Sequence, residues 1–131
     1  MITVCTSTKN VSSPLLLQKI QNYFGHCASL CYYEFPEFAN NQHPQELFDF
    51  IYNEIKVKID NDSDIFIVTW SDIVLYAIRV AIAESNKETE VHCFQFDTDK
   101  MIIADILRNG QMTEWMPGCF DTVDKANLKL L

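Results

Sequence analysis

Apolar residues occur along the chain in short, nearly unbroken runs, at residues 2–5, 28–33, 65–68 and 91–96. Runs of this length that are apolar on both faces are typical of strands buried in a sheet that helices cover. Segments with helical spacing separate the first three runs and precede the fourth. This alternation predicts an α/β fold with three layers, in which helices flank a mainly parallel sheet.

Three segments carry helix signals. Ser12 or Ser13 can cap a helix that Pro14 begins and Gly25 ends. A segment that is apolar almost all round runs from about Asp72 to Glu84, which predicts either deep burial or one face left for a partner. Another helix opens at His43-Pro44, and its apolar side consists of Leu47, Phe48, Ile51, Ile55 and Ile59.

The pattern changes after residue 90. Strands at 91–96 and 101–107 meet at a polar turn, and Asn109-Gly110 favours a second tight turn that leads into a strand at 111–115. We therefore expect a C-terminal antiparallel β-meander, followed by a short helix within 121–131. The whole chain, 1–131, is predicted to form one domain, with an α/β core over 1–90 and the meander and tail over 91–131.

Composition narrows the classes of partner. The chain has 131 residues and a net charge of −8, which disfavours non-specific binding to nucleic acid. No run approaches the ~18 apolar residues that a membrane-spanning helix needs, and the first residues lack the pattern of a signal peptide. We expect a cytoplasmic protein with no membrane partner, in which the five cysteines are reduced thiols.

The sequence offers little support for a phosphate loop or a metal site. The stretch 6–13 lies between a strand and a helix but has Thr6 and Val11 where a phosphate loop has glycine, and Ser12 where it has lysine. Zinc ligands could come from His26, Cys27, Cys31, His92 and Cys93. Residues 92 and 93 should point to opposite faces of a strand, so we expect no metal, no cofactor and no cysteine–histidine nucleophile.

Two acidic residues follow the second apolar run. Glu34 and Glu37 would lie at the carboxyl edge of the sheet, where α/β proteins usually hold ligands and Mg²⁺. The alternative is a solvated turn with two surface carboxylates, which the chemistry alone favours.

Several segments, in order, resemble the predicted ATPases related to ABC and SMC proteins that are grouped with overcoming-lysogenization-defect-like nucleases of phage defence. Residues 32–37 with His43-Pro44-Gln45 are similar to the Walker B end of that family, and 65–72 are similar to its switch strand, with Trp70 in place of the histidine. Residues 115–121 are similar to its Trp-Pro-x-Gly-Phe-Phe-Asp tail, with one inserted residue and Cys119 in place of the first Phe. The stretch 11–18 faintly resembles its signature helix. The resemblance spans nearly the whole chain and corresponds to the C-terminal half of such an ATPase.

The resemblance implies a degenerate nucleotide site. Its positions in this chain are Glu34, Phe35, Glu37, Thr69, Trp70 and Ser71. Glu34 keeps the acidic Mg²⁺-binding position, but Phe35 cannot orient water and Trp70 offers only an indole donor. We therefore expect no ATP hydrolysis by the chain alone.

A role in protein binding is the favoured interpretation. The chain would be a non-catalytic, ATPase-like subunit or regulator of an ATPase or nuclease, or would pair with itself. Candidate contact residues are Tyr76, Arg79, Trp115, Met116 and Phe120, although the last three could instead plug the edge of the core. Two alternatives remain: a composite ATP site completed by a partner chain, and a stand-alone nucleotide-binding domain.

Overall fold

A computed structural model describes residues 1–8, 18, 22, 43–97, 100–117, 119–120 and 128–130, and the backbone of 31–34. The expected helix at 14–25 and most of the C-terminal segment 121–131 lie outside the described residues. The described elements are β1 (Ile2–Ser7), β2 (Cys31–Glu34), α3 (Pro44–Asp60), β3 (Ile65–Val68), α4 (Asp72–Glu84), β4 (Val91–Phe96) and β5 (Met101–Asp105).

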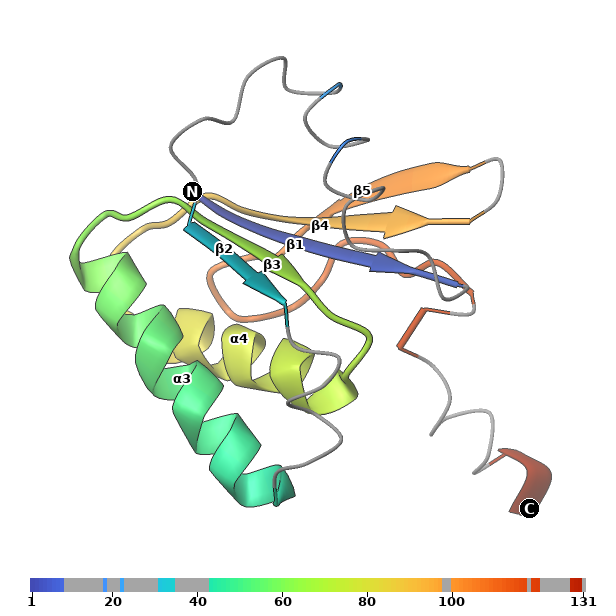
Figure 1. The fold of residues 1–131 in the computed structure, drawn as a ribbon, viewed down its shortest axis with the longest axis horizontal. Coiled ribbons are helices and arrows are strands. Elements are labelled where there is room, and N and C mark those ends of the chain that lie inside the picture. The colour runs from blue at the N-terminus through green and yellow to red at the C-terminus, as the bar shows by residue number, and fades with distance from the viewer. Residues whose placement is uncertain are drawn as a thin grey trace.

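The molecule has an α/β fold built on a mainly parallel sheet, as the alternating pattern predicts. Within the described residues, the sheet has five strands in the order β2-β3-β1-β4-β5. The first four strands pair in parallel, and β5 pairs antiparallel with β4 (Figure 1). Strand β1 therefore occupies the centre, and α4 connects the two strands on either side of it.

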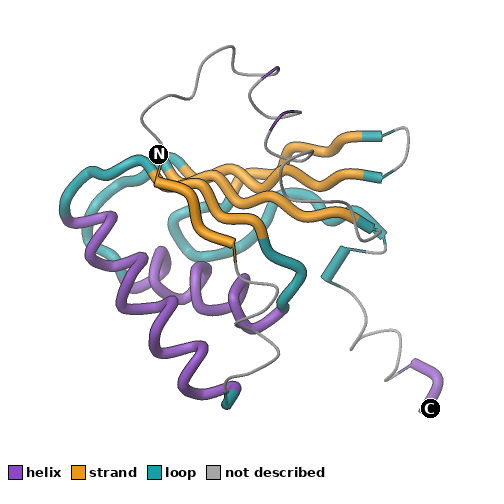
Figure 2. Tube along the Cα trace, in the orientation of Figure 1, coloured by secondary structure: helices purple, strands orange, loops and turns teal. Residues whose placement is uncertain are grey.

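Both helices begin and pack as the sequence predicts. The His43 ring Nδ1 accepts a hydrogen bond from the Gln45 backbone N–H (3.2 Å), and Pro44 occupies the first turn of α3. The Ser71 hydroxyl accepts one from the Val74 N–H (3.4 Å) and caps α4. Both helices lie on the same side of the sheet (Figure 2). Their buried side chains join one core cluster with the sheet, to which α3 contributes Leu47, Ile51, Ile55 and Ile59.

The opposite face of the sheet is buried as well. A second cluster there contains Cys5, Phe66, Val68, Phe94 and Phe96. Burial on both faces explains why β1, β3 and β4 read as apolar runs. Among the described residues, no helix combines the length and the apolarity that crossing a membrane requires.

The C-terminal meander is shorter than the sequence suggests. Strand β5 ends at Asp105, and the segment that follows meets it in a single bridge between Ile106 and Met112. A tight turn forms with Gly110 at φ 82°, but it is not the type I′ turn that Asn-Gly favours, because Asn109 lacks the positive φ that a type I′ turn requires. The expected strand at 111–115 is absent because the Gln95 side chain, on a central strand, binds the backbone at 114 and 116 and draws this segment away from the sheet edge.

Candidate functional site

The carboxyl edge of the sheet brings together the ends of β1 and β3. The Trp70 indole Nε1 donates a hydrogen bond to the Ser7 hydroxyl at 3.0 Å. Just beside it, the Thr69 hydroxyl accepts a bond from the Ser71 N–H (3.0 Å) and is fully buried. Three of the residues predicted for a nucleotide site thus shape the turn from β3 into α4.

Glu34 reaches the same edge. Strand β2 pairs in parallel with β3, and Glu34 lies opposite Val68 in the register, one residue before Thr69. Glu34 and residues 69–71, which the family resemblance assigns to one site, therefore lie at the same edge of the sheet. Phe35 and Glu37 lie outside the described residues.

A further polar pair at this edge was not foreseen from the sequence. The Thr8 hydroxyl donates to the Asp97 carboxylate at 2.7 Å, and the Thr8 N–H donates to the Phe96 carbonyl at 2.9 Å. Thr8 and Asp97 each follow directly after a strand, and this position could have marked them as candidates from the sequence. That the two side chains meet is shown only by the pairing of β1 with β4. The hydroxyls of Ser7 and Thr8 at this edge thus take part in hydrogen bonds within the chain.

Three of the predicted contact residues form one exposed group, here called the aromatic–arginine cluster: Tyr76, Arg79 and Trp115. The Arg79 guanidinium carbon lies 5.3 Å from the centroid of the Tyr76 ring and 5.4 Å from that of Trp115. Its Nε donates to the Gly110 carbonyl at 2.7 Å. Tyr76 is 55% exposed and Trp115 46% exposed. The two exposed rings can stack on an incoming group, and the guanidinium between them adds a positive charge and hydrogen-bond donors.

Met116 and Phe120 do not belong to this surface. Met116 is 4% exposed, and its N–H donates to the Gln95 Oε1 at 2.8 Å. Phe120 is half-buried and packs against the main core. Met116 and Phe120 therefore pack onto the core, while Trp115, between the two backbone groups that bond to the buried Gln95 side chain, stays exposed.

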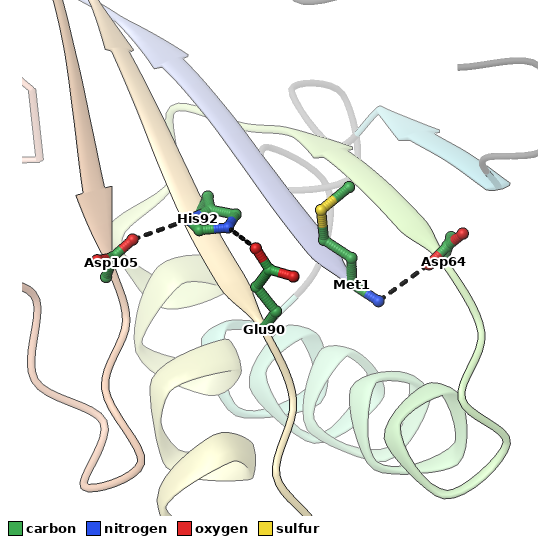
Figure 3. Close-up of polar contacts among 5 residues, drawn as sticks. All are labelled: Met1, Asp64, Glu90, His92 and Asp105. Atoms are coloured by element: carbon green, nitrogen blue, oxygen red, sulfur yellow. Dashed lines mark hydrogen bonds and ion pairs between the residues drawn. The ribbon is translucent and has the colours of Figure 1, made fainter. Parts of the chain in front are cut away.

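The histidine at the amino end of β4 serves an ion pair instead of a metal. Figure 3 shows His92 between Glu90 and Asp105, with its Nε2 2.7 Å from the Glu90 carboxylate and its Nδ1 2.8 Å from that of Asp105. Partial burial opposes the charged ring, but the two hydrogen bonds outweigh it and raise the His92 pKa. Both ring nitrogens are thus engaged in hydrogen bonds within the chain.

Cys93 faces the other side of the strand, as its neighbouring position requires. It is buried in the main core, where burial and then the nearby Cys119 raise the pKa of its thiol to about 12. A thiol with this pKa is not a nucleophile at neutral pH. Among the described residues, no group of His, Cys, Asp and Glu is arranged to hold a metal ion.

Comparisons with models of protein families, with curated proteins and with solved structures gave no match to this chain.

Proposed function

We propose that this chain is a non-catalytic, ATPase-like module that binds a protein partner and acts as a subunit or regulator of an ATPase or nuclease. The observation that carries the proposal is the aromatic–arginine cluster, Tyr76–Arg79–Trp115, in which a charged group is held between two exposed rings. Trp, Tyr and Arg are the residue types that dominate binding energy at protein interfaces.

The cluster is fixed before any partner arrives. Arg79 lies on α4, and its bond to Gly110 ties that helix to the turn preceding Trp115. The Gln95 side chain holds the backbone on both sides of Trp115, at Glu114 and Met116. Side chains held in place lose less conformational entropy on binding, so more of the contact energy remains as affinity.

The carboxyl edge supports the absence of catalysis. Trp70 stands where the resembled family has its switch histidine, and its indole bonds to Ser7. An indole N–H can donate but cannot exchange a proton with an attacking water. The edge therefore supplies no proton acceptor at that position.

The test is binding to a purified full-length ATPase or nuclease of the resembled family, encoded next to this chain, measured by titration calorimetry. Replacing Tyr76 and Trp115 with Ala should weaken binding about thirtyfold or more, the equivalent of about 2 kcal/mol. Phe50→Ala and Val57→Ala remove exposed apolar side chains of α3 (43% and 53% exposed) and serve as matched controls. Equal affinity of the cluster variant and the controls would contradict the proposal.

A composite ATP site is the second candidate, favoured by the position of Glu34 next to the end of β3. In that case the partner supplies the phosphate loop and Glu34 contributes to holding Mg²⁺. Mixing the two chains should then raise ATP turnover, and Glu34→Gln should abolish the increase. A mixture whose rate does not change with Glu34→Gln would remove this candidate, while binding through the aromatic–arginine cluster would still stand.

Stand-alone nucleotide binding would appear as thermal stabilisation of the isolated chain. A ligand present at a hundred times its Kd adds about 2.7 kcal/mol to the free energy of unfolding. We expect millimolar Mg-ATP to leave the Tm unchanged.

A further inference from the structure

Among the described strands, β5 forms one border of the sheet (Figure 1). In an antiparallel pair, residues alternate between bonding to the partner strand and facing outward. Asp97 and Lys100 exchange both bonds at one end of the β4–β5 pair, and the Ile106 N–H donates to the Val91 carbonyl (3.0 Å) at the other. Met101, Ile103 and Asp105 therefore direct their N–H and C=O groups outward.

The outward groups of Asp105 are already bonded. The Asp105 N–H donates to the Thr113 hydroxyl (2.9 Å), and its carbonyl accepts from the Thr113 N–H (3.0 Å). The same segment continues past β5, where the Leu107 N–H donates to the Gln111 carbonyl at 2.8 Å. The segment 111–113 therefore covers the edge of β5 only as far as Asp105. In the part of the chain that the structure describes, no group bonds to the outward N–H and C=O groups of Met101 or Ile103.

The side chains of this short edge lack the usual protection. Proteins commonly protect an edge strand by keeping it short, by covering it, or with proline, charged residues or a bulge. Here β5 is short and is covered at Asp105, but residues 101–104 read Met-Ile-Ile-Ala, without proline or charge, and the charged residues Lys100 and Asp105 lie outside the unpaired part. Met101 is 40% exposed, and Ile102 and Ile103 are half-buried. An apolar strand with unpaired backbone groups is a surface to which another strand can add.

We propose that a second copy of this chain pairs with β5 along this edge, antiparallel and across a two-fold axis at Ile102. In this register the outward N–H and C=O groups of Met101 bond to those of Ile103 in the second copy. By the two-fold symmetry, those of Ile103 bond to Met101 of the second copy. Ile102 then meets Ile102 on one face of the sheet, and Met101 meets Ile103 on the other. The two sheets become one continuous sheet.

The capping of Asp105 selects this register. The neighbouring antiparallel register would place the axis at Ile103 and set Met101 opposite Asp105. The backbone groups of Asp105 are taken by Thr113, so that register would lose its outer bonds. The occupant is a second copy because the segment complements itself: apolar side chains face each other on both sides of the pair, and the same unpaired groups meet across the axis.

The pairing should be weak and should depend on salt. It involves a short segment, and each copy carries a net charge of −8, which opposes association at low ionic strength. We expect a dimer with a dissociation constant on the order of 10 to 500 μM, tightening as salt screens the repulsion. Sedimentation equilibrium of the purified full chain, at concentrations up to about 1 mM, covers this range.

Charge exchange at Ile102 tests the axis itself. Ile102→Lys and Ile102→Glu each place like charges opposite one another, which should raise the dissociation constant about tenfold or more. An equal mixture of the two variants places opposite charges across the axis, so it should recover association as a heterodimer. Recovery in the mixture is expected only if residue 102 of one copy faces residue 102 of the other.

A backbone test separates the main-chain bonds from the side chain. Met101→Pro removes an outward N–H that β4 does not use, at the first residue of an edge strand, where proline is tolerated. Met101→Ala keeps that N–H and is the matched control, with circular dichroism confirming that both variants fold. Met101→Pro should be monomeric, whereas Met101→Ala should still form the dimer.

Three results would overturn the dimer: a wild-type chain that stays monomeric at high salt, no recovery in the mixed variants, or equal association of the proline and alanine variants. The variant that lacks Tyr76 and Trp115 should keep its dimer. Loss of the dimer would therefore leave the proposed partner-binding surface untouched, and the reverse also holds.

Discussion

Replacing Gly110 with alanine should destabilise the protein because two independent costs fall on one added methyl group. Gly110 has φ 82°, a backbone conformation that costs an L-residue roughly 1–2 kcal/mol. The added Cβ would also lie 2.7 Å from the Arg79 carbonyl oxygen and 3.2 Å from the Ala83 Cβ. Such overpacking typically costs about 1–3 kcal/mol. The reduced entropy of the unfolded chain returns about 0.4–1 kcal/mol, so we expect a net loss of about 1–4.5 kcal/mol.

Urea unfolding, followed by circular dichroism, measures this loss. With a urea m-value of about 2 kcal/mol/M, a decrease of about 1–4.5 kcal/mol corresponds to a fall of about 0.5–2 M in the urea midpoint. The matched control is Asn109→Ala in the same turn, which removes the bond from the Gln111 N–H to the Asn109 Oδ1 (3.0 Å) and should cost about 1 kcal/mol. A Gly110→Ala variant within about 0.5 kcal/mol of the wild type would refute the steric reasoning.

Two other predictions concern buried and charged polar groups. Gln95→Leu should lower the free energy of unfolding by about 2–3 kcal/mol, because the Met116 N–H loses its acceptor in a buried place, whereas the exposed Gln111→Leu should change it little. Equal effects of the two substitutions in urea titrations would contradict this. His92→Gln should cost about 1 kcal/mol or less, since both carboxylate partners are more than half exposed. Because folding raises the His92 pKa, its stabilisation should be complete below about pH 6.5 and should disappear as pH rises through the folded value. A difference between wild type and His92→Gln that stays constant from about pH 5.5 to 9 would disprove the ion pair's contribution.

The carboxyl edge was only partly predictable from the sequence. Glu34 was expected at the carboxyl edge because it follows an apolar run, and the resemblance grouped it with residues 69–71; in the structure Glu34 pairs with Val68. The contact of Trp70 with Ser7 and that of Thr8 with Asp97 depend on which strands are neighbours. That information is absent from any local pattern.

The sequence by itself determined four of the described elements, α3, α4, β3 and β4. Pro44 after a capping histidine set the start of α3, and the bounds of α4, β3 and β4 follow from local apolar spacing. These signals act within a few residues, where capping bonds and side-chain periodicity are decided by the chain's own neighbours.

Tertiary structure alone decided the order of the strands and the surface that we propose binds a partner. The sequence does not reveal that β1 lies between β3 and β4, that Gln95 pulls the 114–116 segment away from the sheet edge, or that Arg79 lies between Tyr76 and Trp115. Each of these features joins residues far apart in sequence, and several strand orders are compatible with the same local patterns. The observed arrangement buries both faces of the sheet and satisfies its backbone hydrogen bonds at the same time, and these conditions apply only to the folded chain as a whole.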